Sequence, residues 1–373
     1  MDIKLNNEIL KAIDILEVHG YLAYVVGGYV RDSLLNIKPS EVDIATDATL
    51  DEVRFLFSNY KIVDYKKNSL VLGVIINNIY IEIATFDGKN IDEDLLNKDF
   101  TINAIAYSPS KGIYDPLNGI KDLENKIIRT TKDAIVSISV NPFRIIKAIS
   151  LSFNKKFTID KELHDVLKSR ADLLKSVNPT RFKKFLDAVL MYKKPSMIID
   201  TYYEVFFAII PELKACYKFD QHSKYHHLDV LSHILAVVDF TSPNLILRYA
   251  ALFHDIEKPK CFSLDENGEG HFYNHYIDSA ETAKDLLTKM NYSKDFINKV
   301  YKLILFHDRR LEPRDVVLKR FIADFGTEDI DLLLELKKCD CLAQNPTMYN
   351  RIDELEIIKN KLNEILIEMK QKK

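Results

Sequence analysis

The chain has 373 residues, no tryptophan and a formal net charge of −3, from 52 Lys+Arg against 55 Asp+Glu. With 47% hydrophobic and 29% charged residues it has the composition of a soluble globular protein with two or three cores, which excludes collagen-like, disulfide-scaffold and wholly disordered chains. No run approaches the ~18 apolar residues of a membrane span, so no membrane association is expected. The N-terminus lacks the pattern of a secretory signal, and four scattered cysteines favour a reducing cytoplasm.

The first 130 residues alternate helical patterns with short β-rich runs. Strands are predicted at 22–26, 42–46, 69–76, 79–86 and 104–108, with a hairpin turn at Asn77-Asn78. After about Arg129 the strand signal fades, and apolar residues at i, i+3 and i+4 predict helices, for example over 181–192 and 353–369. The predicted fold class is therefore α+β, with a head that contains a small mixed sheet and an all-α trunk.

A glycine turn and paired carboxylates form the first candidate site. Gly27 and Gly28 follow the first predicted strand, where backbone N–H groups can approach phosphate oxygens, and Arg31 can add a bidentate contact. Asp43 lies in the second predicted strand and Glu41 is two residues before it, so strand alternation should point both to one face. Such a pair beside a phosphate site is typical of Mg²⁺-dependent phosphoryl transfer, and Glu82 is a candidate third carboxylate.

These motifs continue with KDFTINAIAY (98–107), YDPLNGIKDLENKIIRTT (114–131), NPFRIIKAIS (141–150) and NPTRFKKFLDAVL (178–190). Together they resemble the successive motifs of class II tRNA nucleotidyltransferases, the CCA-adding enzymes and bacterial poly(A) polymerases, over roughly residues 1–310. The resemblance implies a polymerase-β-type nucleotidyltransferase head. The site residues that it implies are the catalytic, Mg²⁺-binding Glu41 and Asp43 and the nucleotide-binding Gly27, Gly28, Arg31, Asp99, Asn103, Asn141 and Arg144.

Several positions depart from the family pattern. Glu41 stands where the family has aspartate, and Asn97-Lys98-Asp99 replaces a family motif with two arginines before the aspartate. Between Phe86 and Asp99 only DGKNIDEDLLNK remains of a longer family loop. In the family, a short loop at this place is associated with enzymes that add CC and leave the terminal A to a partner. The sequence therefore leaves CC, CCA and poly(A) products open.

Residues 141–194 form a basic segment, with a local charge of +8 inside an acidic protein. This charge indicates either a polyanion-binding surface or a solvated, lysine-rich helix face. The family reads its base with an E-D-x-x-R motif, of which this chain keeps Arg144, while Asn141 can accept or donate a hydrogen bond. Lys147 and Ser150 stand at two further family arginines. The residues expected to contact RNA phosphates are Lys147, Lys155, Lys156, Lys183 and Lys184.

Eight of the ten histidines lie between residues 222 and 307. Neutral imidazoles and carboxylates from separate helices can converge on a transition metal. The ordered pattern is similar to that of HD phosphohydrolase domains, although Glu257 stands where they usually have glycine. The resemblance implies a divalent transition metal that makes a bound water nucleophilic toward phosphoesters. The ligands that it implies are His233, His254, Asp255 and Asp308, with His271, His275 and His307 nearby.

The sequence thus predicts four parts: a nucleotidyltransferase head (1–130), a helical neck for nucleotide selection and RNA binding (131–205), an HD domain (206–315) and a helical tail without a catalytic motif (316–373). The expected function is template-independent addition of CMP, as CC or CCA, to the 3′ end of tRNA from CTP and ATP. One alternative is an HD-type phosphohydrolase that acts on RNA ends or nucleotides and has a degenerate, RNA-gripping head. Another is a non-catalytic RNA-binding protein. The sequence does not indicate the oligomeric state.

Overall fold

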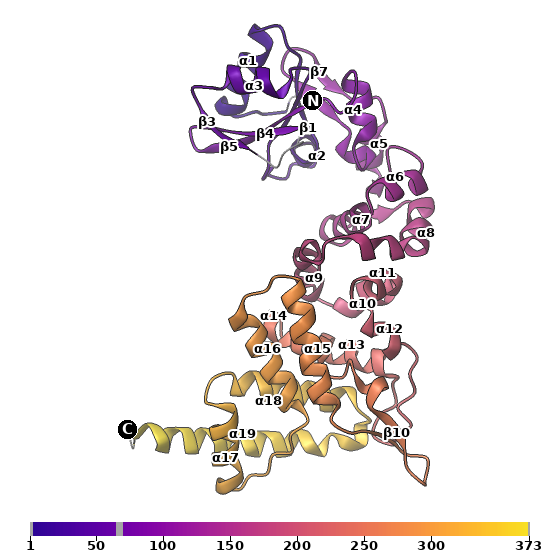
Figure 1. Cartoon of the computed structure of the whole chain (residues 1–373), viewed down its shortest axis with the longest axis vertical. Helices are drawn as coiled ribbons and strands as arrows, with labels where there is room; N and C mark the ends of the chain where they lie inside the picture. The colour runs from indigo at the N-terminus through magenta and orange to yellow at the C-terminus, as the bar shows by residue number, and fades with distance from the viewer. Residues whose placement is uncertain (1–2, 65–69, 372–373) are drawn as a thin grey trace. The chain divides into compact units, whose positions relative to one another are not determined.

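The structure is a computed structural model that describes residues 3–64 and 70–371. The chain divides into two compact units, Met1–Arg170 and Ala171–Lys373. The division falls inside the segment predicted as a neck, and the finer division into four parts stays a prediction. Figure 1 shows the first unit in indigo to magenta and the second from magenta to yellow.

The first unit begins with a mixed α/β arrangement and ends in helices (Figure 1). Its helices are α1 (Asn7–Val18), α2 (Gly28–Leu34), α3 (Leu50–Leu56), α4 (Ile91–Asn97), α5 (Gly119–Glu124), α6 (Ala134–Val140), α7 (Phe143–Lys155) and α8 (Lys161–Ser169), with a 3₁₀ turn η1 (Thr101–Asn103). Its strands are β1 (Ala23–Val26), β2 (Asp43–Thr46), β3 (Lys61–Asp64), β4 (Val71–Ile76), β5 (Ile79–Thr85), β6 (Ala106–Ser108), β7 (Gly112–Tyr114), β8 (Ile127–Ile128) and β9 (Thr158–Ile159).

The main sheet has seven strands in the order β3-β4-β5-β2-β1-β6-β7. Only the β2–β5 pair in it is parallel, which confirms the predicted mixed sheet. All five predicted strands are present in shortened form, although Ser69 lies outside the described residues. The prediction missed the short edge strands β3 and β7. Asn77 and Asn78 form the expected hairpin turn, with φ values of 44° and 67°.

Alternation along the strands gives the sheet two buried faces. Ile44 of β2 and Ile83 of β5 pack in one core with α1 and α3, whereas Ala45 packs in a second core with α4. Asp43 precedes Ile44, and Glu82 lies between two residues of the first core, so both carboxylates are on the α4 face. The sheet therefore presents two acidic side chains from neighbouring strands on the face opposite α1 and α3.

The second unit is almost entirely helical. Its helices are α9 (Lys183–Leu190), α10 (Pro195–Thr201), α11 (Tyr203–Ile209), α12 (Glu212–Cys216), α13 (Val230–Phe240), α14 (Leu245–Phe253), α15 (His275–Lys289), α16 (Lys294–His307), α17 (Asp315–Phe325), α18 (Ile330–Ala343) and α19 (Asn350–Gln371). It also has 3₁₀ turns η2 (Ala171–Ser176), η3 (Pro179–Phe182), η4 (Lys258–Cys261) and η5 (Pro346–Met348), and a hairpin of β10 (Phe262–Leu264) and β11 (Gly270–Phe272).

Helix α14 is the centre of this unit. Its residues from Leu247 to Phe253 are all buried, and it contacts α13, α15, α16 and α18. The mixed-sheet head and the mostly helical remainder confirm the predicted fold class. The β10–β11 hairpin and the short β8–β9 pair are departures from an all-α trunk.

All four cysteines are free thiols, three of them buried. In the part of the chain that the structure describes, no helix taken singly combines the length and apolar character needed to cross a bilayer. If α6 and α7 are taken together as one bent segment, that segment meets the criteria of length and apolar composition, and only these two criteria apply.

Candidate functional site

The glycine turn lies directly beside the carboxylates in the first unit. Gly27 caps the N-terminus of α2 with a φ of +72°, a left-handed conformation that favours glycine. A Cβ atom at this position would lie 3.3 Å from Oδ2 of Asp43. Both the conformation and the close approach therefore require glycine where β1 leads into α2.

Asp43 and Glu82 are paired residues of the parallel strands β2 and β5. Burial and the charges of Glu82 and Glu41 together raise the pKa of Asp43 to about 6, although Lys98 and Lys147 act in the opposite direction. Glu41 is exposed and precedes β2. Strand alternation therefore does not determine where its side chain points, although the sequence argument had used alternation to set Glu41 on the same face as Asp43. Glu82 is the carboxylate that the sheet register brings opposite Asp43.

A series of polar contacts joins three of the predicted nucleotide-site residues and Lys147, which was predicted to contact RNA. Arg31 donates through Nη1 to Oδ1 of Asn103 at 2.7 Å, and the Asn103 amide donates to Asp99 at 2.8 Å. Lys147 of α7 forms an ion pair with the other oxygen of Asp99 at 2.9 Å. Burial alone would raise the pKa of Asp99, but Lys147 and Asn103 hold it below its usual value. The structure thus brings Arg31, Asn103 and Asp99 together with α7.

Asp32, to which the sequence analysis gave no role, extends this series. Its carboxylate is buried and accepts from Arg31 Nε at 2.9 Å and from Lys155 Nζ at 3.1 Å. Lys155, predicted to contact RNA, is therefore held by a buried acid at the C-terminal end of α7. The only sequence signal for Asp32 was its place next to Arg31 in the glycine motif.

Arg144 and Asn141 lie at the start of α7. Arg144 donates to Ser137 Oγ at 2.7 Å and to the carbonyl oxygen of Asn97 at 2.8 Å. The side-chain oxygen of Asn141 accepts from the backbone N–H of Phe143 at 3.2 Å. With its oxygen engaged, the Asn141 amide has its NH₂ group left to donate to a ligand.

The other predicted RNA-contact lysines differ in exposure. Lys156 is exposed in the left-handed C-cap of α7, with a φ of 58°. In the second unit Lys184 is exposed, whereas the ammonium of Lys183 lies 4.3 Å from the centre of the Tyr292 ring. Their role in RNA binding stays a prediction.

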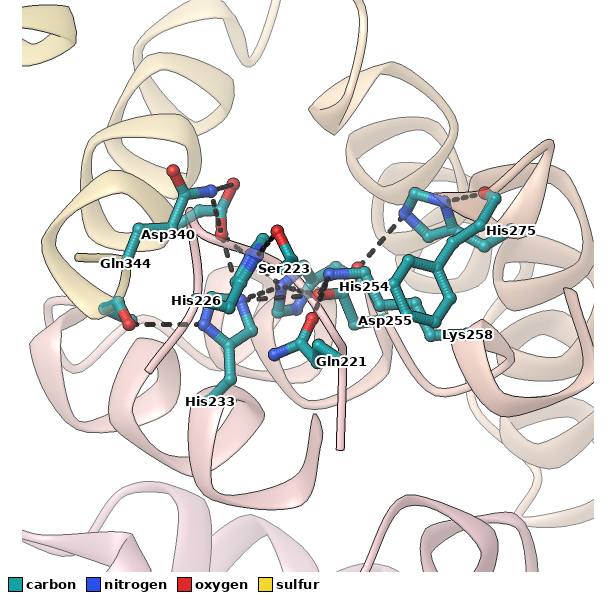
Figure 2. Close-up of polar contacts among 12 residues, drawn as sticks. Gln221, Ser223, His226, His233, His254, Asp255, Lys258, His275, Asp340 and Gln344 are labelled. Carbon is teal, nitrogen blue, oxygen red and sulfur yellow. Dashed lines mark hydrogen bonds and ion pairs between the residues drawn. The ribbon is translucent and has the colours of Figure 1, made fainter. Parts of the chain in front are cut away.

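Five histidines of the second unit form a cluster, and four of them are labelled in Figure 2. They are His226, His233, His254, His275 and His307. His233 on α13 and His254 after α14 are fully buried, with their Nε2 atoms 3.4 Å apart. Asp255 lies between them, with Oδ2 3.3 Å from each of these nitrogens. Two overlapping groups have the spacing of metal ligands: His233, His254 and Asp340, and His254, Asp255 and His307, with ligand atoms within 4.8 Å of one another.

Asp308, one of the predicted ligands, belongs to neither group. It is the exposed C-cap of α16, one residue beyond the buried His307. The second acid is Asp340 on α18, with Oδ1 3.0 Å from His233 Nε2. Asp340 lies in the segment predicted as a tail without catalytic residues, so the sequence analysis missed it. Its one sequence signal was a charged residue within the apolar pattern of α18.

Further buried side chains surround this pair of groups. His275 Nε2 lies 3.1 Å from Asp255 Oδ1, and the buried ammonium of Lys258 lies 2.6 Å from Asp255 Oδ2. The His226 ring packs edge-on against His233, and its Nε2 is buried without a hydrogen-bond partner among the described residues. His271 is elsewhere, paired with Asp265 at 3.2 Å.

The histidines of the cluster differ in pKa. Burial alone would lower the pKa of His233, but the hydrogen bonds that its ring donates to Asp255 and Asp340 raise the pKa to about 9. Burial, with the charges of Lys258 and His233, lowers the pKa of His226 to about 3. His226 is therefore a neutral imidazole whose Nε2 is unused, beside the ring of His233.

Glu257, which replaces a family glycine, packs without conflict. It accepts from Thr282 Oγ1 at 2.6 Å, and its backbone N–H donates to Ser279 at 3.2 Å. Both partners are on α15, so Glu257 ties the turn after His254 and Asp255 to that helix.

Residues 23–129 match the family described as the poly(A) polymerase head domain. This segment is therefore similar to the head domain of poly(A) polymerases. The domain contains the glycine turn, Asp43, Glu82, Asp99 and Asn103. The resemblance to CCA-adding enzymes and bacterial poly(A) polymerases, identified from the motifs, is confirmed by this match and by the relatives that follow.

Two relatives were found by sequence. The chain is 33% identical over 182 residues to a CC-adding tRNA nucleotidyltransferase of Halalkalibacterium halodurans, over 49% of this chain and 48% of that protein. It is 32% identical over 212 residues to a CCA-adding enzyme of Geobacillus sp., over 52% of each chain. The chain therefore spans about half the length of the curated relatives it matches.

A solved structure extends the likeness beyond the head domain. The crystal structure of the Bacillus stearothermophilus CCA-adding enzyme in complex with CTP matches with a TM-score of 0.65 and 21% identity, over 93% of this chain and 81% of that one. At 21% identity the match shows a shared fold alone, and this shared fold extends over 93% of the chain.

Proposed function

We propose that this protein adds CMP, as CC or CCA, to the 3′ end of tRNA without a nucleic-acid template. The observation that carries the proposal is the assembly on one sheet face of Asp43 and Glu82 with the series of polar contacts from Arg31 to Lys147. The sequence relatives named for CC and CCA addition, and the CTP complex of the structural neighbour, support this substrate class.

In this reaction the 3′-hydroxyl oxygen of the RNA bonds to the α-phosphorus of the nucleotide, and the bond to pyrophosphate breaks. Arg31 and the N–H groups at the start of α2 would bind the triphosphate, because guanidinium and helix N-terminal donors favour phosphate oxygens. Asp99 and Asn103 hold Arg31 and Lys147 in place. Arg144 and Asn141, at the start of α7, would contact the base.

The carboxylates fit Mg²⁺. The charges of Glu82 and Glu41 disfavour the anionic form of Asp43, and a divalent cation with oxygen ligands relieves that repulsion. Asp43 and Glu82, with Glu41 at the edge, are the residues that would hold it. When bound, Mg²⁺ would stabilise the negative charge that develops on the reacting phosphate.

A primer-extension assay tests the proposal. Purified protein and Mg²⁺ are incubated with a tRNA transcript that ends at the discriminator base, each labelled nucleotide being offered separately and then CTP with ATP. Growth by two residues from CTP supports CC addition, and a third from ATP supports CCA addition. A long homopolymer from ATP would identify a poly(A) polymerase, and no growth with any nucleotide would refute the proposal.

We propose metal-dependent phosphohydrolysis of RNA ends or nucleotides as a second activity, on the strength of the histidine cluster. Its imidazole and carboxylate donors fit a divalent transition metal, and the unpaired Nε2 of His226 adds one more donor. His233, His254, Asp255, His307 and Asp340 are the residues that would hold it. When bound, the metal would supply a nucleophilic hydroxide at neutral pH.

Two substitutions separate the activities. Asp43→Ala should abolish CMP addition and leave hydrolysis of 2′,3′-cyclic or phosphorylated RNA ends intact, whereas Asp255→Ala should do the reverse. Each variant is thus the control for the other. If tRNA binds but neither activity is present in the wild type, the protein is a non-catalytic RNA-binding protein.

A further inference from the structure

Lys155, the last residue of α7, lies beside Arg31. Its Nζ atom is 3.1 Å from Oδ1 of Asp32, and the same oxygen accepts a hydrogen bond from Arg31 Nε at 2.9 Å. Because both nitrogens contact one oxygen atom, the two cations are close enough to bind neighbouring oxygens of one polyphosphate. Asp32 therefore holds Lys155 next to the residue that is proposed to bind the triphosphate.

Lys155 keeps donors that the protein does not use. In the part of the chain that the structure describes, Asp32 is the sole hydrogen-bond partner of its ammonium group, which has three N–H donors. The Lys155 side chain is 22% exposed, so a ligand can reach it. Nη2 of Arg31 lies over the glycine turn, 3.5 Å from where a Cβ atom of Gly28 would be. A polyphosphate at the glycine turn would therefore meet Arg31 and, beside it, Lys155.

The local charge balance depends on Lys155. The series of polar contacts contains two acids, Asp32 and Asp99, and their cationic partners hold both pKa values below the usual value. Its three cations are Arg31, Lys147 and Lys155. The group therefore has one positive charge in excess, and without Lys155 it would have none. A triphosphate is strongly anionic, so an excess positive charge at this place favours its binding.

Helix α7 has side chains for both ends of a nucleotide. Arg144, which is proposed to contact the base, is in its first turn, and Lys155 is its last residue. The helix has 13 residues and is therefore about 20 Å long. Lys147 lies between these two positions and pairs with Asp99. A nucleotide with its base at the start of α7 and its phosphates at Arg31 would lie along the helix, with its terminal phosphates toward Lys155.

We infer that Lys155, together with Arg31, binds the β- and γ-phosphates of the incoming nucleotide. This role differs from the RNA contact that the sequence predicts for Lys155. The inference rests on the proposed function, because it names a residue that binds the substrate of nucleotide addition. The β- and γ-phosphates are the same in CTP and ATP, so Lys155 contributes equally to the binding of both.

Isothermal titration calorimetry of the full-length protein, with Mg²⁺ and without RNA, tests the inference with CTP, ATP and CMP as separate probes. Lys155→Met removes the ammonium group but keeps an unbranched side chain, and Asp32 still has Arg31 as a partner. This variant should bind CTP and ATP about tenfold or more weakly, by the same factor, since each loses a charge-assisted contact. Its affinity for CMP, which lacks both terminal phosphates, should be unchanged. Lys155→Arg should keep most of the affinity for CTP.

Lys161→Met is the matched control, because Lys161 is exposed at the first residue of α8 and, within residues 3–64 and 70–371, is not a partner of Asp32. It should bind all three nucleotides as tightly as the wild type does. Equal losses of CTP and CMP affinity in Lys155→Met would overturn the inference and indicate a purely structural ion pair. Weaker binding of a tRNA transcript with unchanged CTP affinity would also overturn it and would restore the RNA contact.

The wild-type protein separates this inference from the proposed function. If the wild type extends tRNA with CMP and Lys155→Met binds CTP as tightly as the wild type, only the role of Lys155 is refuted. A wild type that binds neither CTP nor ATP would overturn both the inference and the proposed function.

Discussion

Asp43 and Glu82 face the same side of the sheet because the parallel register of β2 and β5 sets them opposite each other. Glu41, the partner that the E-x-D spacing suggested, is exposed before β2 begins. The acidic site thus depends on a non-local strand pairing as well as on a local motif. Glu82 should therefore matter to catalysis although it lies outside the recognised motif.

Glu82→Gln should lower kcat for CMP addition about 100-fold or more, because a lost metal-binding charge removes several kcal/mol of transition-state stabilisation. Glu124→Gln on the exposed surface of α5 makes the same chemical change and should leave kcat unaltered. Steady-state primer extension measures both. A Glu82→Gln enzyme within twofold of wild type would show that β5 supplies no metal ligand.

Asp43→Asn should stabilise the metal-free protein at pH 7.5 by about 1–3 kcal/mol, although it abolishes nucleotide addition. The folded-state pKa of Asp43 is raised from 3.8 to about 6, so the cost of ionising it in the folded state builds up between these two pH values and is complete above pH 6. Well below pH 3.8 the carboxyl is protonated in both states and the difference should vanish. Urea unfolding in EDTA at several pH values measures it. An equal gain at pH 7.5 and pH 4 would contradict this origin.

The local motifs made the head predictable. Its strands are short apolar runs separated by recognisable turns such as Asn77-Asn78, and Gly27 of the glycine motif has the positive φ that favours glycine. Glu82 and Asp32 acquire their roles through the register of β5 and through Lys155 on α7. Such contacts depend on how elements pack, which one sequence does not reveal.

Asp32→Asn should destabilise the protein at pH 7 by about 1–3 kcal/mol and raise KM for CTP, because Arg31 and Lys155 lose their shared acceptor charge. Burial would raise the pKa of Asp32, but Arg31 and Lys155 hold it below 3.8. The stabilisation should therefore be complete above about pH 4 and be lost as the pH falls through the folded-state pKa. Chemical denaturation between pH 7 and pH 2 checks this, and a pH-independent difference would argue against it.

Asn141→Asp should lower incorporation of UMP relative to CMP by about tenfold. The Asn141 oxygen is held by the Phe143 N–H, so its NH₂ group can donate to the O4 of uracil, whereas a carboxylate can only accept. A hydrogen bond to a charged group is worth about 1.5–3 kcal/mol, which corresponds to tenfold or more. Single-nucleotide addition with labelled UTP and CTP gives the ratio, and equal ratios in the two enzymes would contradict the prediction.

The last prediction concerns two acids that line one pocket of the second unit. Asp340→Asn should remove the metal from the second unit, because Oδ1 of Asp340 lies 3.0 Å from Nε2 of His233 and completes one of the two ligand groups. Asp308→Asn is the matched control, since Asp308 is exposed at the end of α16 and belongs to neither group. Elemental analysis of protein purified in the presence of Mn²⁺ or Ni²⁺ measures the bound metal. We expect about one equivalent or more in the wild type and the Asp308 variant, and strong loss in the Asp340 variant. Loss of metal in the Asp308 variant alone would restore the ligand set that the sequence suggested and would require the end of α16 to move toward the cluster.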